Sequence, residues 1–155
     1  MYPQAFPDED LVPLVRELLQ KNVGALSLVA TIASSLAGHV LFTRARLAES
    51  GDAAALLGPL AVSPAQQRRG IGSALVREGL DRLQREGVQQ VLVLGDPAYY
   101  GRFGFTTESS VLTPYELPAE WATAWQSLTL GSNRAPGSGK LMLPEPWMRQ
   151  KLWSP

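Results

Sequence analysis

The sequence lacks cysteine and contains a single histidine, His39, among its 155 residues. Disulfide bonds, thiolate catalysis and cysteine-based metal sites are therefore excluded together. One histidine also rules out a metal site built from several imidazoles, so we expect no metal cofactor.

An excess of charge of either sign is lacking as well, because Lys and Arg number 14 and Asp and Glu also number 14. A balanced chain has no long-range field that would favour nucleic acid or an anionic membrane as a partner. Any site for an anion must therefore be local.

Long apolar runs are missing too, since none approaches the roughly 20 residues that span a bilayer. The start, MYPQAFPDEDL, has neither the basic nor the apolar region of a secretory signal. Apolar residues make up 45% of the chain and charged residues 18%, and no repeat or long linker divides it. We expect a cytoplasmic protein with one domain over residues 1–155.

The first part of the chain predicts a helix and a hairpin. Asp8 is a candidate N-cap for a helix over 8–20. Apolar runs at 25–32 and 39–47 flank a short turn around 34–38 and predict two paired strands. A polar loop follows at 48–54.

The middle of the chain predicts an α/β fold with a mixed sheet. A buried strand at 56–62 contains a Gly-Pro pair, which indicates a bulge or a splayed strand. A helix over 70–87, a buried strand at 89–95 and a short helix at 97–105 follow. This strand–helix–strand order favours a parallel pair within the sheet.

The tail is less regular. We expect a helical turn and a strand in 121–130, a loop at 131–139 and an edge strand within 140–147. All four tryptophans lie here, and they either pack the end of the sheet, which we favour, or line a substrate pocket: Trp121, Trp125, Trp147 and Trp153.

The stretch QQRRGIGSAL, residues 66–75, joins the buried strand to the long helix. A glycine-containing turn into a helix presents unpaired N–H groups and the positive end of the helix dipole, which together bind anions. Gly70 and Gly72 let a phosphate approach the backbone closely. A solvated basic turn is the alternative interpretation.

Three phosphate-binding patterns compete for this stretch. The P-loop needs Gly-Lys-Ser/Thr, which is absent. The dinucleotide fingerprint needs a small residue where Leu75 stands, although Asp96 lies near the position of its acid, so a nicotinamide-dependent protein stays open. The third pattern, Gln/Arg-x-x-Gly-x-Gly/Ala, is met by residues 67–72.

That third pattern resembles the acetyl-CoA loop of the GCN5-related N-acetyltransferase (GNAT) superfamily. The resemblance extends over LGPLAVSPAQQRRGIGSALVREGL and VLVLGDPAYYGRFGF, and is similar in detail to the YhbS-like branch. It implies a strongly twisted mixed sheet in which the strands at 56–62 and 90–95 splay and the pantetheine arm lies between them. The co-substrate is then acetyl-CoA, and the acceptor is a small-molecule or peptide amine.

The resemblance also implies a set of cofactor-binding residues. Leu60 and Val62 would pair with the pantetheine arm, and the amides from Gln67 to Ser73 would hold the pyrophosphate. Arg102 either contacts phosphate or faces solvent, and Phe103 is also a core candidate. The full set is Leu60, Ala61, Val62, Gln67, Arg68, Arg69, Gly70, Ile71, Gly72, Ser73, Tyr99, Arg102 and Phe103.

Tyr100 matches the family's tyrosine that protonates the departing thiolate, a role suited to a phenol. Packing against the sheet is the alternative for both Tyr99 and Tyr100. The strand at 56–62 has no carboxylate to act as general base. His39 is a candidate base, with a structural role or a water chain as alternatives; Asp96 is expected to cap the helix that follows it.

Relatives usually have a strand and a helix ahead of the predicted first helix. Without that strand, residues 25–32 form a sheet edge. Another segment, a second copy in a homodimer, or sequence lost from the start would then cover it. A CoA-binding module without turnover is the rival to an N-acetyltransferase.

Overall fold

A computed structural model describes residues 11–20, 24–131 and 137–155. The predicted cap Asp8 lies outside the described residues, as does most of the predicted loop at 131–139. Among the described residues, no helix combines the length and the hydropathy that crossing a membrane requires.

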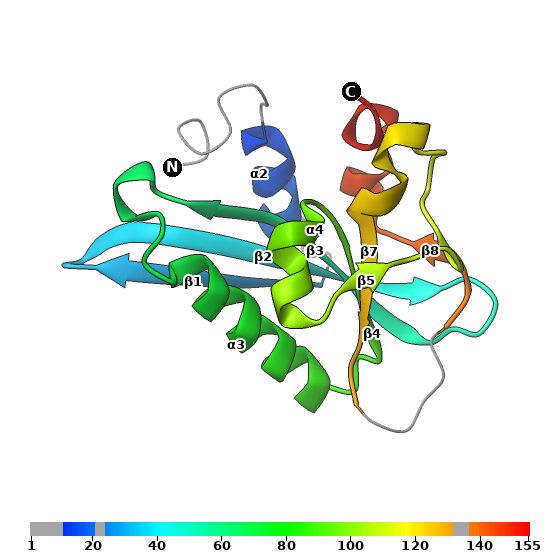
Figure 1. Ribbon diagram of the computed structural model, residues 1–155, viewed down its shortest axis with the longest axis horizontal. Coiled ribbons are helices and arrows are strands. Elements are labelled where there is room, and N and C mark those ends of the chain that lie inside the picture. Colours follow the sequence, from blue (N-terminus) through cyan, green and yellow to red (C-terminus); the bar gives the residue numbers. More distant parts are fainter. Residues whose placement is uncertain (1–10, 21–23, 132–136) are drawn as a thin grey trace.

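The described chain forms one curled sheet with helices on both sides (Figure 1). The helices are α2 (Val12–Gln20), α3 (Ile71–Arg85) and α4 (Pro97–Tyr100). The strands are β1 (Ala25–Ile32), β2 (Ser35–Leu47), β3 (Ala53–Val62), β4 (Gln90–Leu94), β5 (Thr106–Thr107), β6 (Val111–Leu112), β7 (Trp125–Thr129) and β8 (Gly139–Met142). Short 3₁₀ turns cover Pro64–Gln66, Gly101–Phe103, Ala119–Ala124, Glu145–Trp147 and Gln150–Trp153.

The sheet order is β5-β7-β4-β3-β2-β8-β6, and β1 pairs with β2 beside β8. The pairs β3–β4 and β6–β8 are parallel and the others antiparallel, so the predicted mixed sheet is confirmed. The parallel pair follows from α3, which carries the chain back across the sheet as a crossover helix. Within the described part of the chain, β1 pairs on one side only, as expected of an edge.

Two apolar cores lie on the two faces of the sheet. Alternating strand residues separate them: Leu41 and Leu56 pack with α2, whereas Phe42 and Leu57 pack with α3. The α2 face also holds three buried tryptophans, which confirms the packing interpretation for them: Trp125, Trp147 and Trp153. Their indole N–H groups all donate to protein oxygen atoms.

The predicted turn around 34–38 and the predicted start of the following strand at residue 39 were both wrong. The hairpin turn is Ala33–Ser34 alone, with φ of 52° and 66°, and β2 already begins at Ser35. Two successive left-handed residues make the tight turn that suits the twist of a hairpin, but neither is a typical residue for it. Gly38 lies inside β2 because α3 passes over it: a Cβ there would lie 2.9 Å from Ile71 Cγ2.

The prediction that a strand within 140–147 forms an edge of the sheet was also wrong. β8 pairs with β2 at Arg46 and Leu47 on one side and with β6 on the other, so it is an interior strand. It lies where β1 has already ended, because β1 pairs with β2 only as far as Thr43.

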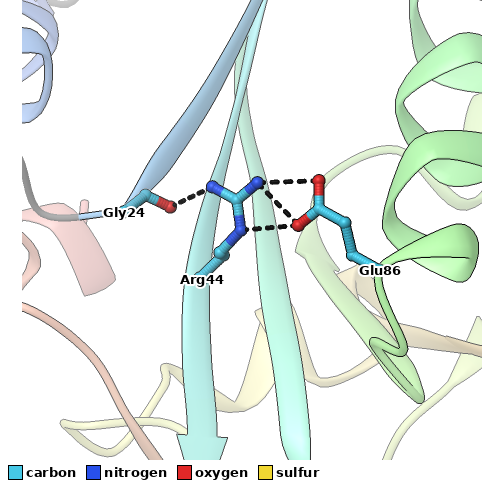
Figure 2. Close-up of polar contacts among 3 residues, drawn as sticks. All are labelled: Gly24, Arg44 and Glu86. Carbon is cyan, nitrogen blue, oxygen red and sulfur yellow. Dashed lines mark hydrogen bonds and ion pairs between the residues drawn. The ribbon is translucent and has the colours of Figure 1, made fainter.

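Arg44 ties the end of α3 to the hairpin (Figure 2). Its guanidinium donates to both carboxylate oxygens of Glu86 at 2.7–2.9 Å and to the carbonyl of Gly24 at 2.9 Å. Both side chains are about two fifths exposed. Because exposed pairs contribute at most about 1 kcal/mol, this contact orients the helix end more than it stabilises the fold.

We predict that Gly79→Ala destabilises the protein, because a Cβ on Gly79 would lie 2.0 Å from Cε2 of Phe42. Phe42 is fully buried and has no room to withdraw. Overpacking of about 1–3 kcal/mol exceeds the helix-propensity gain of about 1 kcal/mol. Urea unfolding measures the difference.

Gly101→Ala is the matched control, because nothing lies within 4 Å of its added Cβ and its φ is −57°. It should leave the free energy of unfolding unchanged or raised. Equal effects of the two substitutions would show that α3 does not press on Phe42.

Candidate active site

The parallel strands β3 and β4 separate before either strand ends. Their pairing stops at Leu57 and Val93, yet β3 continues to Val62. The register with β2 shifts at the same place: Val40 opposes Leu60, and Phe42 opposes Leu57. β3 therefore carries one extra residue, which is the bulge expected from the Gly-Pro pair.

The backbone of Leu60 and Val62 faces the gap between the strands. Ser63 N–H donates to Ala37 O at 2.8 Å, so Ser63 is a hydrogen-bonded position in the antiparallel ladder. Such positions alternate, which makes Ala61 the next one and turns the polar groups of Leu60 and Val62 away from β2. The side-chain Nε2 of Gln67 donates to Val62 O at 3.1 Å, which agrees with that direction.

A cavity of about 550 Å³ opens at this gap. Its lining includes most of the predicted residues and Tyr100: Leu60, Val62, Gln66, Gln67, Arg68, Gly70, Ile71, Gly72, Ser73, Asp96, Tyr99, Tyr100 and Arg102. Three predicted residues do not line it. Ala61 packs into the core on the α2 face, Arg69 is exposed to solvent, and Phe103 packs against Tyr99 and Tyr100.

The start of α3 presents free N–H groups to the cavity. Gly70 is the N-cap in the left-handed region, with φ of 78°, and it provides no capping side chain. The first helical bond runs from Ala74 N–H to Gly70 O, so the preceding amides lack helical partners. Gly72 leaves room for the Tyr99 hydroxyl, because a Cβ on residue 72 would lie 2.6 Å from it and would displace the end of that side chain.

Tyr100 lies against the end of β4. A Cβ on Gly95 would lie 2.4 Å from Cε2 of Tyr100, so only glycine leaves the ring its place. The ring also contacts Tyr99, Phe103 and Phe105. Burial, together with the charges of Tyr99 and Asp96, raises the pKa of Tyr100 well above its ordinary value of 10.0. The phenol is therefore protonated, and able to donate, throughout the physiological range.

Asp96 has the capping role expected from the sequence. Its Oδ1 accepts from Ala98 N–H at 2.9 Å, at the start of α4. The carboxylate follows β4 by two residues and is engaged as a helix cap.

His39 lies on β2 outside the cavity, and it is 5% exposed. Its Nε2 lies 2.7 Å from Ser27 Oγ on β1, and in the sheet it is paired with Ala61. Burial lowers the pKa of His39 below its ordinary value of 6.5, so the imidazole is neutral at pH 7. The structure thus does not place His39 and Tyr100 in the same cavity.

One family model, described as the acetyltransferase (GNAT) family, matches residues 1–105. The chain belongs to that family. The predicted N-acetyltransferase class is thereby confirmed at the level of the family.

Two curated relatives support the same conclusion. The chain is 38% identical over 135 residues to the uncharacterized N-acetyltransferase YjhQ of Escherichia coli K12, covering 81% of this chain and 75% of YjhQ. It is 35% identical over 103 residues to YhbS of the same organism, covering 66% of this chain. That second match spans 62% of YhbS, less than two thirds of its length.

Solved GNAT structures confirm the fold. YhbS from Escherichia coli, crystallised in complex with CoA, superposes with a TM-score of 0.79 at 30% identity, covering 88% of this chain and 77% of that one. A GNAT acetyltransferase from Brucella melitensis, in complex with acetyl-CoA, gives a TM-score of 0.71 at 28% identity, covering 92% and 84%.

Three residues of this GNAT site escaped the sequence analysis. Gln66 lines the cavity, and its buried Oε1 has no hydrogen-bond partner. Gly95 makes room for Tyr100. Gln126, which is 1% exposed on β7, donates to Gly95 O and Ala124 O at 3.1 and 3.2 Å. Only Gln66, next to the motif, carried a signal in the sequence.

We predict that His39 makes the fold weaker in mild acid. A folded-state pKa below the unfolded value of 6.5 means that the unfolded chain binds the proton more tightly. The associated stability is complete above pH 6.5 and is lost as the pH falls through 6.5 toward the folded value. Urea unfolding between pH 7.5 and 5.5 should show this loss, and His39→Gln should flatten it.

The range stops at pH 5.5 because carboxylates begin to titrate below it. An unchanged slope in His39→Gln would show that His39 does not carry the pH dependence.

Proposed function

We propose that this chain transfers the acetyl group of acetyl-CoA to a primary amine, by direct attack while both substrates are bound. The observation that carries the proposal is the joining, in one cavity, of a strand segment that has left its parallel neighbour, a free helix N-terminus and a half-buried tyrosine. The complexes of YhbS with CoA and of the Brucella protein with acetyl-CoA support it.

The residues present fit acetyl-CoA part by part. The polar groups of Leu60 and the N–H of Val62 face the gap and suit the amides of the pantetheine arm, which pair with a strand edge as another strand would, while Val62 O already accepts from Gln67. The first-turn amides of α3 suit the pyrophosphate. The orphaned Oε1 of Gln66 has the chemistry to accept a hydrogen bond from a ligand N–H group.

Acetyl-CoA supplies an activated thioester, whose C–S bond breaks as the C–N bond to the amine forms. The N–H groups on the separated part of β3 stabilise the negative charge that develops on the carbonyl oxygen. Tyr100 donates its phenolic proton to the departing sulfur. A buried site raises the pKa of a thiol as it raises that of the phenol, which keeps the proton transfer feasible.

The amine proton needs an acceptor, and β3 from Ala53 to Val62 has no carboxylate. His39 is our candidate, because its imidazole is neutral and lies in register with Ala61 on the adjacent strand. It stands outside the cavity, so the proton would reach it through water.

The same missing carboxylate favours a second candidate, a CoA-binding module without turnover. The two functions differ in one assay: only an enzyme releases free CoA thiol when acetyl-CoA and a panel of amines are supplied together.

The acceptor, the assembly and the location complete the proposal. Neutral net charge leaves small amines and peptide amines as acceptor classes. The edge strand β1, with Val29 59% and Ile32 39% exposed, is the place where a second copy would add in a homodimer. We place the enzyme in the cytoplasm.

We predict that Gly70→Asp abolishes CoA binding and that Gly70→Asn retains it. The two side chains have the same shape, and nothing lies within 4 Å of a Cβ at this position. Both variants meet the same strain at φ of 78°, so only the added negative charge separates them. Isothermal titration with CoA measures both.

Loss of binding in both variants would mean that backbone strain, and not phosphate repulsion, disables the loop. Retention in both would place the phosphates elsewhere.

We predict that Tyr100→Phe lowers kcat by about 10²- to 10⁴-fold, the usual contribution of a general acid. The Kd for CoA should change little, because the ring keeps its contacts with Gly95 and Phe105. Thiol release and titration calorimetry measure the two quantities. A variant with unchanged kcat would limit Tyr100 to packing.

A further inference from the structure

Arginines around the first half of α3 lack carboxylate partners among the residues that the structure describes. They are Arg68, Arg69, Arg77 and Arg102. The second half of the same helix is balanced, since Arg82 and Arg85 pair with acids one turn earlier, at 2.9 Å each. Among the described residues, positive charge without an ion-pair partner is therefore concentrated at the cavity end of α3, where Asp96 is the carboxylate that lines the cavity.

Arg102 contacts two aromatic rings and two hydrogen-bond acceptors and has further donors available. Its guanidinium lies 4.4 Å from the centre of the Tyr99 ring and 5.6 Å from that of Phe103. Nε donates to Tyr99 O at 3.2 Å, and Nη2 donates to Ser73 Oγ at 3.3 Å. A guanidinium has five N–H groups, so three are left for an anion.

Arg77 adds a second charge beside the first. Its guanidinium lies 5.0 Å from the centre of the same Phe103 ring. Arg102 lines the cavity, whereas Arg77 and Phe103 do not. Arg102 contacts Ser73 in the first turn of α3, and Arg77 lies one turn later on the same helix, so the two arginines extend the positive charge past the first-turn amides.

The parts of CoA each find a counterpart in the cavity. The cavity joins Tyr100 and Leu60 at the strand gap, where the thioester would react, to the first turn of α3 and to Arg102, which donates to Ser73 in that turn. In CoA the groups run from the thiol through pantetheine and pyrophosphate to the ribose, which carries a 3′-phosphate. A phosphomonoester bears about −1.5 to −2 charges at pH 7 and suits a guanidinium that is already held in place.

We propose that Arg102, assisted by Arg77, binds the 3′-phosphate of CoA and makes this site selective for CoA over its 3′-dephospho form. This inference rests on the proposed CoA site. It adds that Arg102 and Arg77, and not only the helix N-terminus, determine which cofactor the cavity accepts.

The test compares the Kd values of CoA and 3′-dephospho-CoA by isothermal titration. The wild-type protein should bind CoA about 10- to 100-fold more tightly, as expected for charge-assisted hydrogen bonds. Arg102→Gln should weaken CoA binding and leave 3′-dephospho-CoA binding unchanged. The double variant Arg77→Gln/Arg102→Gln should bind both ligands equally, within about 3-fold.

Arg85→Gln is the control matched to Arg77→Gln, with the same loss of charge on α3, at an exposed position at the far end of the helix. It should keep the wild-type ratio. Equal binding of the two ligands by the wild type, or an undiminished ratio in the double variant, would overturn the inference while leaving the CoA site intact. Failure of folded wild-type protein to bind either ligand would overturn the proposed function together with the inference.

Discussion

Beyond Leu57 and Val93 the parallel strands β3 and β4 no longer hydrogen-bond to each other, and the site depends on this break. Backbone groups at a sheet interior are normally satisfied by the next strand, so an unpaired stretch invites another extended chain. The extra β3 residue opposite β2 shifts the register at the same place, so the polar groups of Leu60 and Val62 face the gap. One irregularity in a strand thus creates an edge inside a sheet.

The opposite wall of the gap is built differently. Gly95 N–H donates to Ala124 O, and the Gln126 side chain donates to Gly95 O. These bonds hold the end of β4 against β7 and the residue before it, and the Tyr100 ring packs directly against Gly95. The wall that carries the candidate acid is therefore held by an antiparallel neighbour, while β3 supplies the free backbone.

Local patterns could be predicted from the sequence, and long-range contacts could not. The turn into α3 was predictable because its glycines and following helix lie within ten residues of one another. The break in β3 was indicated by Gly58 and Pro59. The role of Gly95 was hidden, since it depends on a ring five residues later folding back, and that of Gln126 depends on a strand pairing about thirty residues apart. The turn at 33–34 was missed because alanine and serine rarely adopt positive φ.

Burial keeps the proposed acid, Tyr100, and the proposed base, His39, neutral at pH 7, in a protein whose strand β3 has no carboxylate. Removing a group from water disfavours its charged form. For Tyr100 this raises the pKa, and for His39 it lowers the pKa, so both side chains are neutral at pH 7. A neutral phenol can give a proton and a neutral imidazole can take one. In the proposed reaction the same desolvation therefore prepares the two groups for opposite tasks.

The strand β3 separates the two side chains, because Tyr100 lines the cavity and His39 lies on β2, the neighbouring strand. In the proposed reaction, the strand that offers its backbone to the thioester also divides the proton donor from the proton acceptor.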